Sequence, residues 1–205
     1  LAATYPVAIV SGRARNDVEP RVALDDLYYA GNHGFDIKGP DRSMTHKEAA
    51  EARPELDNVE RQLHEQLDAI DGTFIERKPF SVAIHYRNVA TAHHATVSDI
   101  VASIARDASH LKRHDGKMVI ELLPDVEWDK GHAVNWIIDA LNIDPEQSLV
   151  MYIGDDETDE DAFRAIHGRG LGIRVGDREI TSLADYVLHD PDEVKSFLRQ
   201  LLERS

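Results

Sequence analysis

The feature that most constrains this chain is an acidic cluster that directly follows an apolar run. Residues 149–153 are apolar, and residues 154–163 then read Gly-Asp-Asp-Glu-Thr-Asp-Glu-Asp-Ala-Phe. A short apolar run, then glycine, then a segment compatible with a helix, predicts a strand followed by a loop and a helix. Ligands of open parallel sheets bind beyond the carboxyl ends of the strands. The sequence therefore predicts that these carboxylates lie where a ligand binds.

Crowded carboxylates of this kind suit a bound cation, because they repel one another when nothing neutralises them. A small number of hard oxygen ligands favours Mg²⁺, which keeps several waters and also binds the oxygens of substrate phosphates. The alternative is the solvated first turn of a helix, where Asp and Glu are favoured by the helix dipole. On Asp155 and Asp156 alone, both interpretations stay open.

A second candidate site lies near the start of the chain. Residues 7–10 are apolar and are followed by Ser11, Gly12 and Arg13. This pattern predicts a strand that ends in a turn, with a helix from about Asn16. A hydroxyl beside the backbone N–H groups of a helix start is well placed to hold a phosphoryl oxygen. An ordinary polar turn is the alternative.

Composition limits the classes of partner. The 205 residues are 42% hydrophobic, which is typical of a folded globular protein with a real core. The formal net charge of −15 argues against nucleic acid and anionic membranes as partners. A phosphorylated small molecule remains compatible with that charge, because a divalent cation and a few Lys and Arg can reverse the potential locally.

Other classes are constrained by what the sequence lacks. With no cysteine, thiol chemistry and Cys-ligated zinc are excluded and a reducing compartment fits, while the 11 histidines lack metal-ligand spacing. The apolar runs are too short to span a membrane and no signal segment opens the chain. We therefore expect a soluble cytoplasmic protein that acts as a monomer.

The acidic run, in its extended form GDDxTDEDAF, resembles the last motif of the haloacid dehalogenase (HAD) phosphohydrolases, and in particular of the trehalose-6-phosphate phosphatase family. Ser11 matches the second HAD motif, residues 28–34 resemble the family's GxHG strand and turn, and Asp129-Lys130-Gly131 matches the third motif. The first motif, DxDGx, supplies the nucleophile and the general acid/base in this family and occurs nowhere in the chain. We expect it upstream of Leu1, and we expect this chain alone to be inactive.

The resemblance implies an α/β fold: an HAD-like Rossmannoid core with a parallel sheet, plus an inserted α/β cap domain. The core is expected at residues 1–36 and 123–205, and the cap at residues 37–122. Within the cap, the pattern predicts helices near 46–70 and 96–108 and strands at 81–87 and 117–123. Within the core it predicts a helix at 133–141, strands at 149–153, 172–175 and 186–188, and an amphipathic packing helix at 192–202.

The resemblance also implies roles for residues of the core. Asp155 is the direct Mg²⁺ ligand, Asp159 supports it and Asp156 is a second ligand. Asp155 and Asp159 are four residues apart, so they share one helical face if the helix begins near Asp156. The ammonium of Lys130, 24 residues before Gly154, would hold the nucleophilic carboxylate and the phosphoryl group together. The implied catalytic residues are Lys130, Ser11 and Asp155.

Sugar recognition is expected from the cap. Residues 76–87 are similar to the family's cap string E-x-K-x-x-S-V-x-x-H-Y-R, and in a strand Ser81, His85 and Arg87 would share one face. Lys117 and Glu121 match the pair that contacts the glucose hydroxyls, although Leu123 stands where the family commonly has Arg. An edge strand with one polar face is the alternative. The implied substrate-binding residues are Ser11, Gly12, Arg13, Glu76, Lys78, Ser81, His85, Arg87, Lys117 and Glu121.

The activity implied by the resemblance is Mg²⁺-dependent hydrolysis of trehalose 6-phosphate to trehalose and phosphate through an aspartyl-phosphate intermediate. Two alternatives stay open. One is another HAD sugar phosphatase, acting for example on sucrose phosphate or mannosyl-3-phosphoglycerate. The other is a non-catalytic regulatory domain that binds trehalose phosphate.

Overall fold

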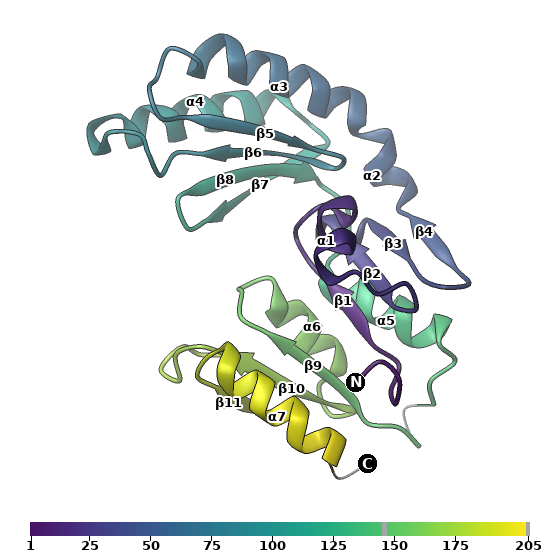
Figure 1. The fold of residues 1–205 in the computed structure, drawn as a ribbon. Coiled ribbons are helices and arrows are strands. Elements are labelled where there is room, and N and C mark those ends of the chain that lie inside the picture. The colour runs from purple at the N-terminus through teal and green to yellow at the C-terminus, as the bar shows by residue number, and fades with distance from the viewer. Residues whose placement is uncertain (145–146, 204–205) are drawn as a thin grey trace. The chain divides into compact units, whose positions relative to one another are not determined.

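The computed structural model describes residues 1–144 and 147–203 and divides the chain into two compact units (Figure 1). The first unit contains residues 1–44 and the segment from Trp128 onward, and the second contains residues 45–127. Residues 37–44 belong to the first unit, although the sequence predicted them in the insertion. The reason is strand pairing: β3 (Asp36–Lys38) pairs with β2 (Tyr28–Gly31), and β4 (Ser43–Thr45) extends the same sheet. Residues 123–127 lie in the second unit, because β8 (Val119–Pro124) continues past the expected boundary.

The first sheet of the first unit has the strand order β1-β2-β3-β4, where β1 spans Ala8–Val10. Strand β1 runs parallel to β2, with Ala8 opposite Tyr28. Helix α1 (Arg15–Val22) connects these two strands and buries Val18 against Leu27 and Tyr29. A 3-10 turn, η1 (Asn32–Gly34), follows β2.

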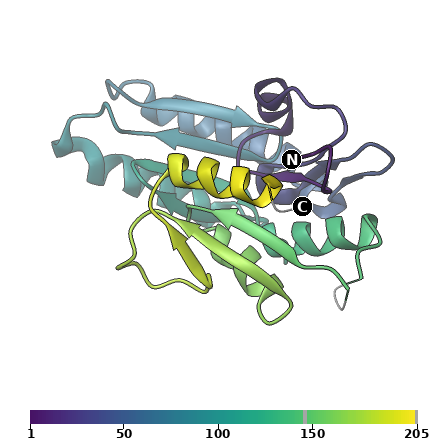
Figure 2. The same cartoon turned by 60° about the horizontal axis from the view of Figure 1, so that its bottom comes forward.

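The second sheet of this unit is parallel, with the order β11-β10-β9. Its strands are β9 (Val150–Gly154), β10 (Gly170–Val175) and β11 (Tyr186–Leu188). Helix α6 (Asp159–Ile166) packs on β9 and β10, and α7 (Pro191–Glu203) lies along β11 (Figure 2). Among the described residues no strand joins the two sheets, so β1 and β9 are both edges.

Helix α5 (Lys130–Ala140) links the two sheets through a shared core. Its Ala133 and Ile137 pack with Tyr28 and Ala30 of the first sheet. Its Val134 and Ile138 pack with Tyr152 and Phe163 beside the second sheet. One helix with two apolar stripes therefore holds the two sheets in one unit.

The second unit is a four-stranded antiparallel sheet with helices on one face. The strand order is β5-β6-β8-β7, with β5 at Phe74–Lys78, β6 at Ser81–His85 and β7 at Leu111–Gly116. Helices α3 (Arg53–Leu67) and α4 (His94–Asp107) pack their apolar stripes against Val82, Ile84, Ile120 and Leu122. The short α2 (Lys47–Glu51) precedes α3, and the 3-10 turn η2 (Thr91–His93) precedes α4. The α/β fold class expected from the sequence is confirmed.

Several predicted boundaries differ by a few residues, for example α5, which begins at Lys130 and not at Ala133, and two of the shifts have a clear local reason. The strand predicted at 81–87 ends at His85, because the N–H of Val89 donates to the carbonyl of Tyr86 (3.1 Å) and closes a turn that contains Arg87. The helix predicted from about Asp156 begins at Asp159, whose carboxylate accepts hydrogen bonds from the preceding loop.

Candidate functional site

Ser11 lies at the carboxyl end of β1, in a turn that leads into α1. Its N–H donates to the carbonyl of Ala30 (2.8 Å), and its Oγ accepts from the N–H of Arg13 (3.1 Å). The guanidinium of Arg13 is largely exposed and pairs with Asp17 at 3.3 Å. The Ser11 hydroxyl thus accepts a bond within its own turn, while its proton can be donated to a bound group.

The end of β2 is tied to this turn. The N–H of Asn32 donates to the carbonyl of Arg13 (2.8 Å), and the N–H of His33 donates to the carbonyl of Ser11 (3.1 Å). A Cβ on Gly31 would lie 2.3 Å from the backbone N of Arg15, so glycine permits β2 to approach the start of α1. The predicted residues Ser11, Gly12 and Arg13 therefore form one turn braced by a neighbouring strand.

Lys130 is the first residue of α5, and its side chain is buried. The side chain of Asp129 caps this helix by accepting from the N–H of His132 (2.9 Å). Lys130 Nζ donates to Asp159 Oδ1 at 2.7 Å, and the hydroxyl of Tyr152 donates to the same oxygen at 2.6 Å. The structure thus joins the third-motif lysine to the acidic run through one buried carboxylate.

The other oxygen of Asp159 organises the loop after β9. Its Oδ2 accepts from the backbone N–H groups of Asp155 (3.0 Å) and Asp156 (2.9 Å). A Cβ on Gly154 would lie 2.4 Å from Asp159 Cγ, so only glycine lets this carboxylate lie against the end of the strand. Asp159 therefore accepts four hydrogen bonds from protein donors.

The charge states of this cluster follow from burial and from the neighbouring charges. Burial alone would raise the pKa of Asp159, but the ammonium of Lys130 and the hydroxyl of Tyr152 outweigh it, and the pKa is lowered from its usual value. Burial, helped by the negative charge of Asp159, raises the pKa of Tyr152. Asp159 is thus ionised beside an ammonium and a neutral phenol.

The loop exposes the carboxylates of Asp155, Asp156 and Glu157, and the first two of these residues directly follow β9. Asp156 Oδ1 accepts from the N–H of Glu157 (2.8 Å). In the described part of the chain, no three His, Cys, Asp or Glu side chains together could hold a metal ion. Two carboxylates fit Mg²⁺, which completes its coordination with waters and other oxygens. Asp159 does not fit as a direct ligand, because its oxygens already accept bonds from protein donors.

In the second unit, three of the predicted sugar-binding residues form one cluster. Glu121 Oε1 accepts from Lys78 Nζ (2.9 Å) and from Ser81 Oγ (2.5 Å). Glu121 and Ser81 are buried, and the Lys78 side chain is only 16% exposed. The strand register explains these contacts. Lys78 lies opposite Ser81, and Glu121 lies opposite Ala83, which is two residues from Ser81 and therefore on the same face of the sheet.

The other predicted residues of the second unit are arranged differently. Glu76 Oε2 lies 3.0 Å from His85 Nε2, and the ring of His85 packs on Phe74 with centroids 5.6 Å apart. Arg87 is exposed in the turn after β6, and Lys117 is exposed in the turn between β7 and β8. The structure therefore brings together Lys78, Ser81 and Glu121, pairs Glu76 with His85, and leaves Arg87 and Lys117 outside both groups.

A sequence model of the family described as trehalose-phosphatase matches residues 1–192. This chain belongs to the trehalose-phosphatase family. It is 39% identical over 209 residues to the probable trehalose-phosphate phosphatase 4 of Oryza sativa subsp. japonica, covering 99% of this chain and 57% of that protein. It is 42% identical over 208 residues to the trehalose-phosphate phosphatase of Mycobacterium marinum, covering 98% of this chain and 53% of that protein. The chain thus spans little more than half the length of these two trehalose-phosphatase relatives.

A solved structure described as a trehalose-6-phosphate phosphatase related protein has the same fold. Its TM-score is 0.81 at 22% sequence identity, and the match covers 100% of this chain and 85% of the other. The family and the HAD-type fold expected from the motifs are confirmed.

Two residues that contact the segments around the acidic run were not predicted from the trehalose-phosphatase motifs. Tyr152 lies within the apolar run that predicts a strand, and it carries the one hydroxyl in that strand. Glu160 accepts from Ser182 Oγ (2.6 Å), the N–H of Leu183 (2.7 Å) and Arg174 (3.2 Å), and so fastens the segment before β11 to α6. A polar atom inside an apolar strand is the signal that identifies Tyr152.

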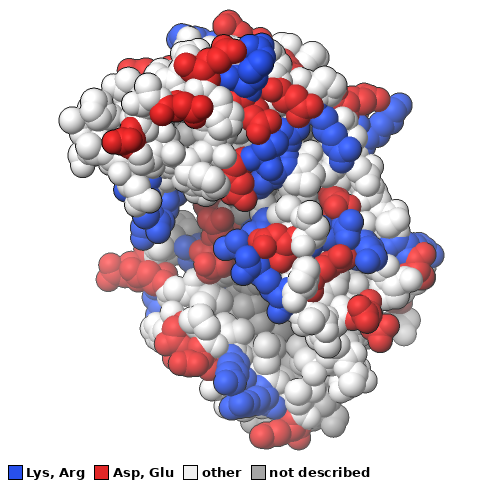
Figure 3. Space-filling view, turned by 45° about the horizontal axis from the view of Figure 1, so that its top comes forward, with Lys and Arg blue, Asp and Glu red and all other residues white. Residues whose placement is uncertain are grey.

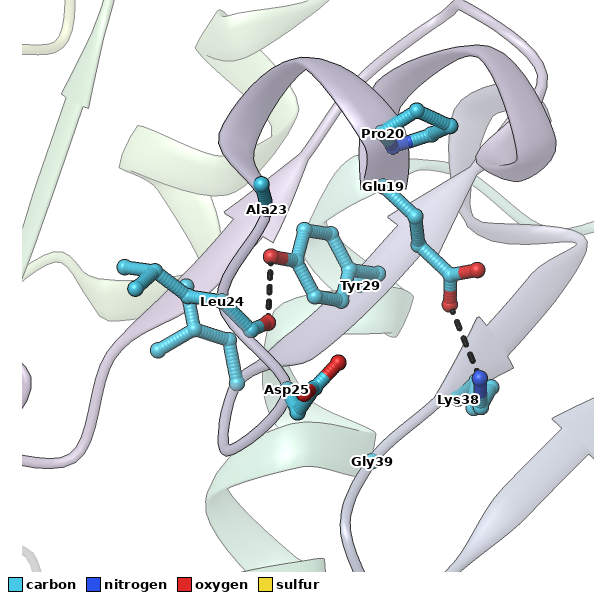
Figure 4. Close-up of a pocket in the computed structure, with 9 residues that line it drawn as sticks. Glu19, Pro20, Ala23, Leu24, Asp25, Tyr29, Lys38 and Gly39 are labelled. Atoms are coloured by element: carbon cyan, nitrogen blue, oxygen red, sulfur yellow. Dashed lines mark hydrogen bonds and ion pairs between the residues drawn. The ribbon is translucent and has the colours of Figure 1, made fainter.

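A cavity of about 260 Å³ lies elsewhere in the first unit, between α1, the segment after it and β3 (Figure 4). Two pairs of polar groups line it: the hydroxyl of Tyr29 donates to the carbonyl of Leu24 (2.7 Å), and Lys38 lies 3.4 Å from Glu19. None of the predicted site residues of this trehalose-phosphatase family member lines the cavity.

Positive and negative side chains alternate on the face of the molecule shown in Figure 3. Neither sign of charge dominates that face.

Proposed function

We propose that the protein to which this chain belongs hydrolyses trehalose 6-phosphate to trehalose and inorganic phosphate. The observation that carries the proposal is the buried ammonium of Lys130, fixed by Asp159 beside two exposed carboxylates. Phosphoryl transfer depends mainly on positioning and on neutralising the charge of the phosphoryl oxygens. Membership of the trehalose-phosphatase family supports this choice of reaction over other uses of the same charges.

In this proposal the turn after β1 binds the phosphoryl group. The Ser11 hydroxyl, the backbone N–H of Gly12 and the exposed guanidinium of Arg13 donate to its oxygens, and Lys130 balances its charge. The family resemblance assigns the attack on phosphorus to an aspartate of a motif that this chain does not contain. Its carboxylate would form an acyl phosphate as the ester P–O bond breaks, and water would then release phosphate.

We assign the binding of Mg²⁺ to Asp155 and Asp156, with Asp159 as the residue that positions their loop and Lys130. When bound, the ion would supply positive charge that neutralises the phosphoryl oxygens. The exposure of the two carboxylates, and the commitment of Asp159 to four protein donors, support this division of roles.

The second unit is proposed to act as a cap that recognises the sugar. Carboxylates, ammonium groups and guanidinium groups are suited to the many hydroxyls of a disaccharide. The Lys78, Ser81 and Glu121 cluster and the pair of Glu76 with His85 provide that chemistry, with Arg87 and Lys117 as exposed additions. We further propose a monomer that acts in the cytoplasm, a compartment that a chain without cysteine fits.

The test is phosphate release by the protein extended through the residues that precede Leu1 in its natural sequence. Trehalose 6-phosphate, sucrose 6-phosphate and glucose 6-phosphate are compared, each with Mg²⁺ and with a chelator. We expect turnover of the trehalose ester alone, and only with the metal. Lys130→Met should lower kcat/KM by about 10²-fold to 10³-fold. Lys195→Met, which replaces an exposed lysine of α7, is the matched control.

Two outcomes would overturn the proposal in different ways. Equal turnover of the sucrose ester would indicate a sugar phosphatase of broader or different specificity. A folded protein that binds trehalose 6-phosphate without turning over any ester would indicate a regulatory domain.

A further inference from the structure

Three successive residues at the end of β2 adopt left-handed backbone conformations. The φ angles are 50° for Asn32, 57° for His33 and 93° for Gly34. Residues other than glycine rarely take positive φ. Strained backbone of this kind persists where the surrounding structure holds it, and it clusters at functional sites.

The surroundings of this segment hold it firmly. The N–H groups of Asn32 and His33 donate into the Ser11 turn, as described above. Trp128 Nε1 donates to the carbonyl of Gly34 at 3.0 Å. A Cβ on Gly34 would lie 2.5 Å from the Cβ of Ala133, so α5 packs directly on the segment. The strained conformation is therefore fixed from two sides.

This conformation places the imidazole of His33 against Gly12, the central residue of the turn. A Cβ on Gly12 would lie 2.8 Å from His33 Cε1 and 2.9 Å from His33 Nε2. The ring thus takes the space that any side chain at position 12 would fill. It brings a nitrogen next to the turn that carries the Ser11 hydroxyl.

The neighbouring side chain is an independent sign that the segment meets another group. Asn32 is only 2% exposed, yet both polar atoms of its side chain lack a hydrogen-bond partner within the described residues. Buried polar groups without partners are uncommon in folded proteins. An unused amide on the residue next to His33 points to a polar group that this segment meets when the site is filled.

We propose that His33 contacts the phosphoryl group of the substrate, donating a hydrogen bond from its imidazole to a phosphoryl oxygen held at the Ser11 turn. This inference rests on the proposed function, because it names a further contact for the same phosphate ester. Hydrogen bonds to phosphate oxygens are charge-assisted and stronger than neutral ones. The left-handed segment serves to bring the ring over Gly12, where an ordinary strand end would not place it.

The test uses the extended protein and two measurements: kcat and KM for trehalose 6-phosphate, and the calorimetric affinity for inorganic phosphate. His33→Ala should weaken phosphate binding about tenfold and lower kcat/KM by about 10-fold to 100-fold. His33→Gln keeps a side-chain donor and should recover part of both losses. His167→Ala, at an exposed position after α6 in the same unit, should leave both within about twofold.

A second variant tests the placement of the ring. Gly12→Ala forces the imidazole away from the turn and should weaken phosphate binding much as His33→Ala does. Because both changes remove the same contact, the double variant should lose little more than either single variant.

The outcomes separate this inference from the proposed function. If the wild type turns over the ester and His33→Ala and His33→Gln leave phosphate affinity unchanged, the contact is absent and the proposed function stands. If the wild type turns over no ester, the proposed function fails, and the phosphate affinities of the same variants still decide whether His33 binds the anion. A lower melting temperature without a change in phosphate affinity would show a structural role only, and would also overturn the inference.

Discussion

Lys130 Nζ lies 2.7 Å from Asp159 Oδ1, and each of the two side chains is only 6% exposed. The residues come from the start of α5 and the start of α6. A buried ion pair costs desolvation when it forms, but removing one partner leaves an uncompensated charge in the interior. The pair should therefore be far more sensitive to a single replacement than the ion pairs at the surface.

The first prediction concerns Asp159→Asn. This change keeps the shape of the side chain but leaves the Lys130 ammonium without a counter-charge, so the free energy of unfolding should fall by about 3 kcal/mol or more. Urea unfolding gives the loss directly. The control is Asp161→Asn, which removes the exposed pair with Arg164 and should cost less than about 1 kcal/mol. Equal losses in the two variants would show that the buried pair has no special weight.

The second prediction concerns Tyr152 at alkaline pH. Burial and the charge of Asp159 raise its pKa in the folded state, so its contribution to stability is complete below pH about 10 and is lost as pH rises further. Above that pH the unfolded chain ionises this phenol and the folded chain does not. In Tyr152→Phe the free energy of unfolding should fall less steeply with pH, by about 1.4 kcal/mol per pH unit. Urea unfolding at several pH values measures both slopes, and parallel slopes would contradict the prediction.

The sequence predicted the elements whose signals are local. The apolar run at 149–153 and the glycine after it predicted β9 and its loop, and the motif resemblance selected Lys130 before any distance was known. Strands β5 and β7 were not predicted, because runs such as Leu111–Gly116 are mostly polar and carry no clear alternation. Their place in the sheet depends on pairing with β6 and β8, each of which follows its partner across a short turn.

The side-chain contacts within the candidate site were harder to predict from the sequence, for a physical reason. Asp159 was expected on the same helical face as Asp155, whereas its carboxylate instead accepts from the Asp155 N–H and holds that residue outside the helix. Periodicity gives the face of a regular element, but it does not tell whether a carboxylate will bond back to its own loop. The meeting of Tyr152 with Asp159 likewise depends on how the strand end and the helix start pack.

The third prediction concerns Gly131, which lies where α5 crosses α6. A Cβ at this position would lie 2.5 Å from the carbonyl oxygen of Asp161, which is backbone and cannot move aside cheaply. Gly131→Ala should therefore lower the free energy of unfolding by about 1–3 kcal/mol. Urea unfolding measures the loss. At Gly168 a Cβ would meet nothing within 4 Å, so Gly168→Asn, which tolerates the left-handed backbone there, should cost less. A fully stable Gly131→Ala protein would mean that the two helices can separate without loss.

The fourth prediction concerns Lys78 and Glu121, whose side chains are 16% and 10% exposed and lie 2.9 Å apart. Glu121→Leu leaves the ammonium of Lys78 and the hydroxyl of Ser81 without their acceptor, so this variant should lose about 3 kcal/mol. Adding Lys78→Met removes the stranded charge, and the double variant should be more stable than Glu121→Leu alone.

The same double-mutant cycle on an exposed ion pair separates the contribution of burial from that of charge alone. Arg61 and Glu65 lie 2.7 Å apart on the surface of α3, with side chains 61% and 60% exposed. Their coupling should not exceed about 0.5 kcal/mol. For each pair, urea unfolding of the wild type, the two single variants and the double variant gives the coupling energy. If Lys78→Met made the Glu121→Leu protein less stable, the ammonium would be reaching water or another acceptor, and the cluster would not depend on Glu121. The predicted rescue follows only if Glu121 is the group that makes a buried lysine tolerable in this sheet.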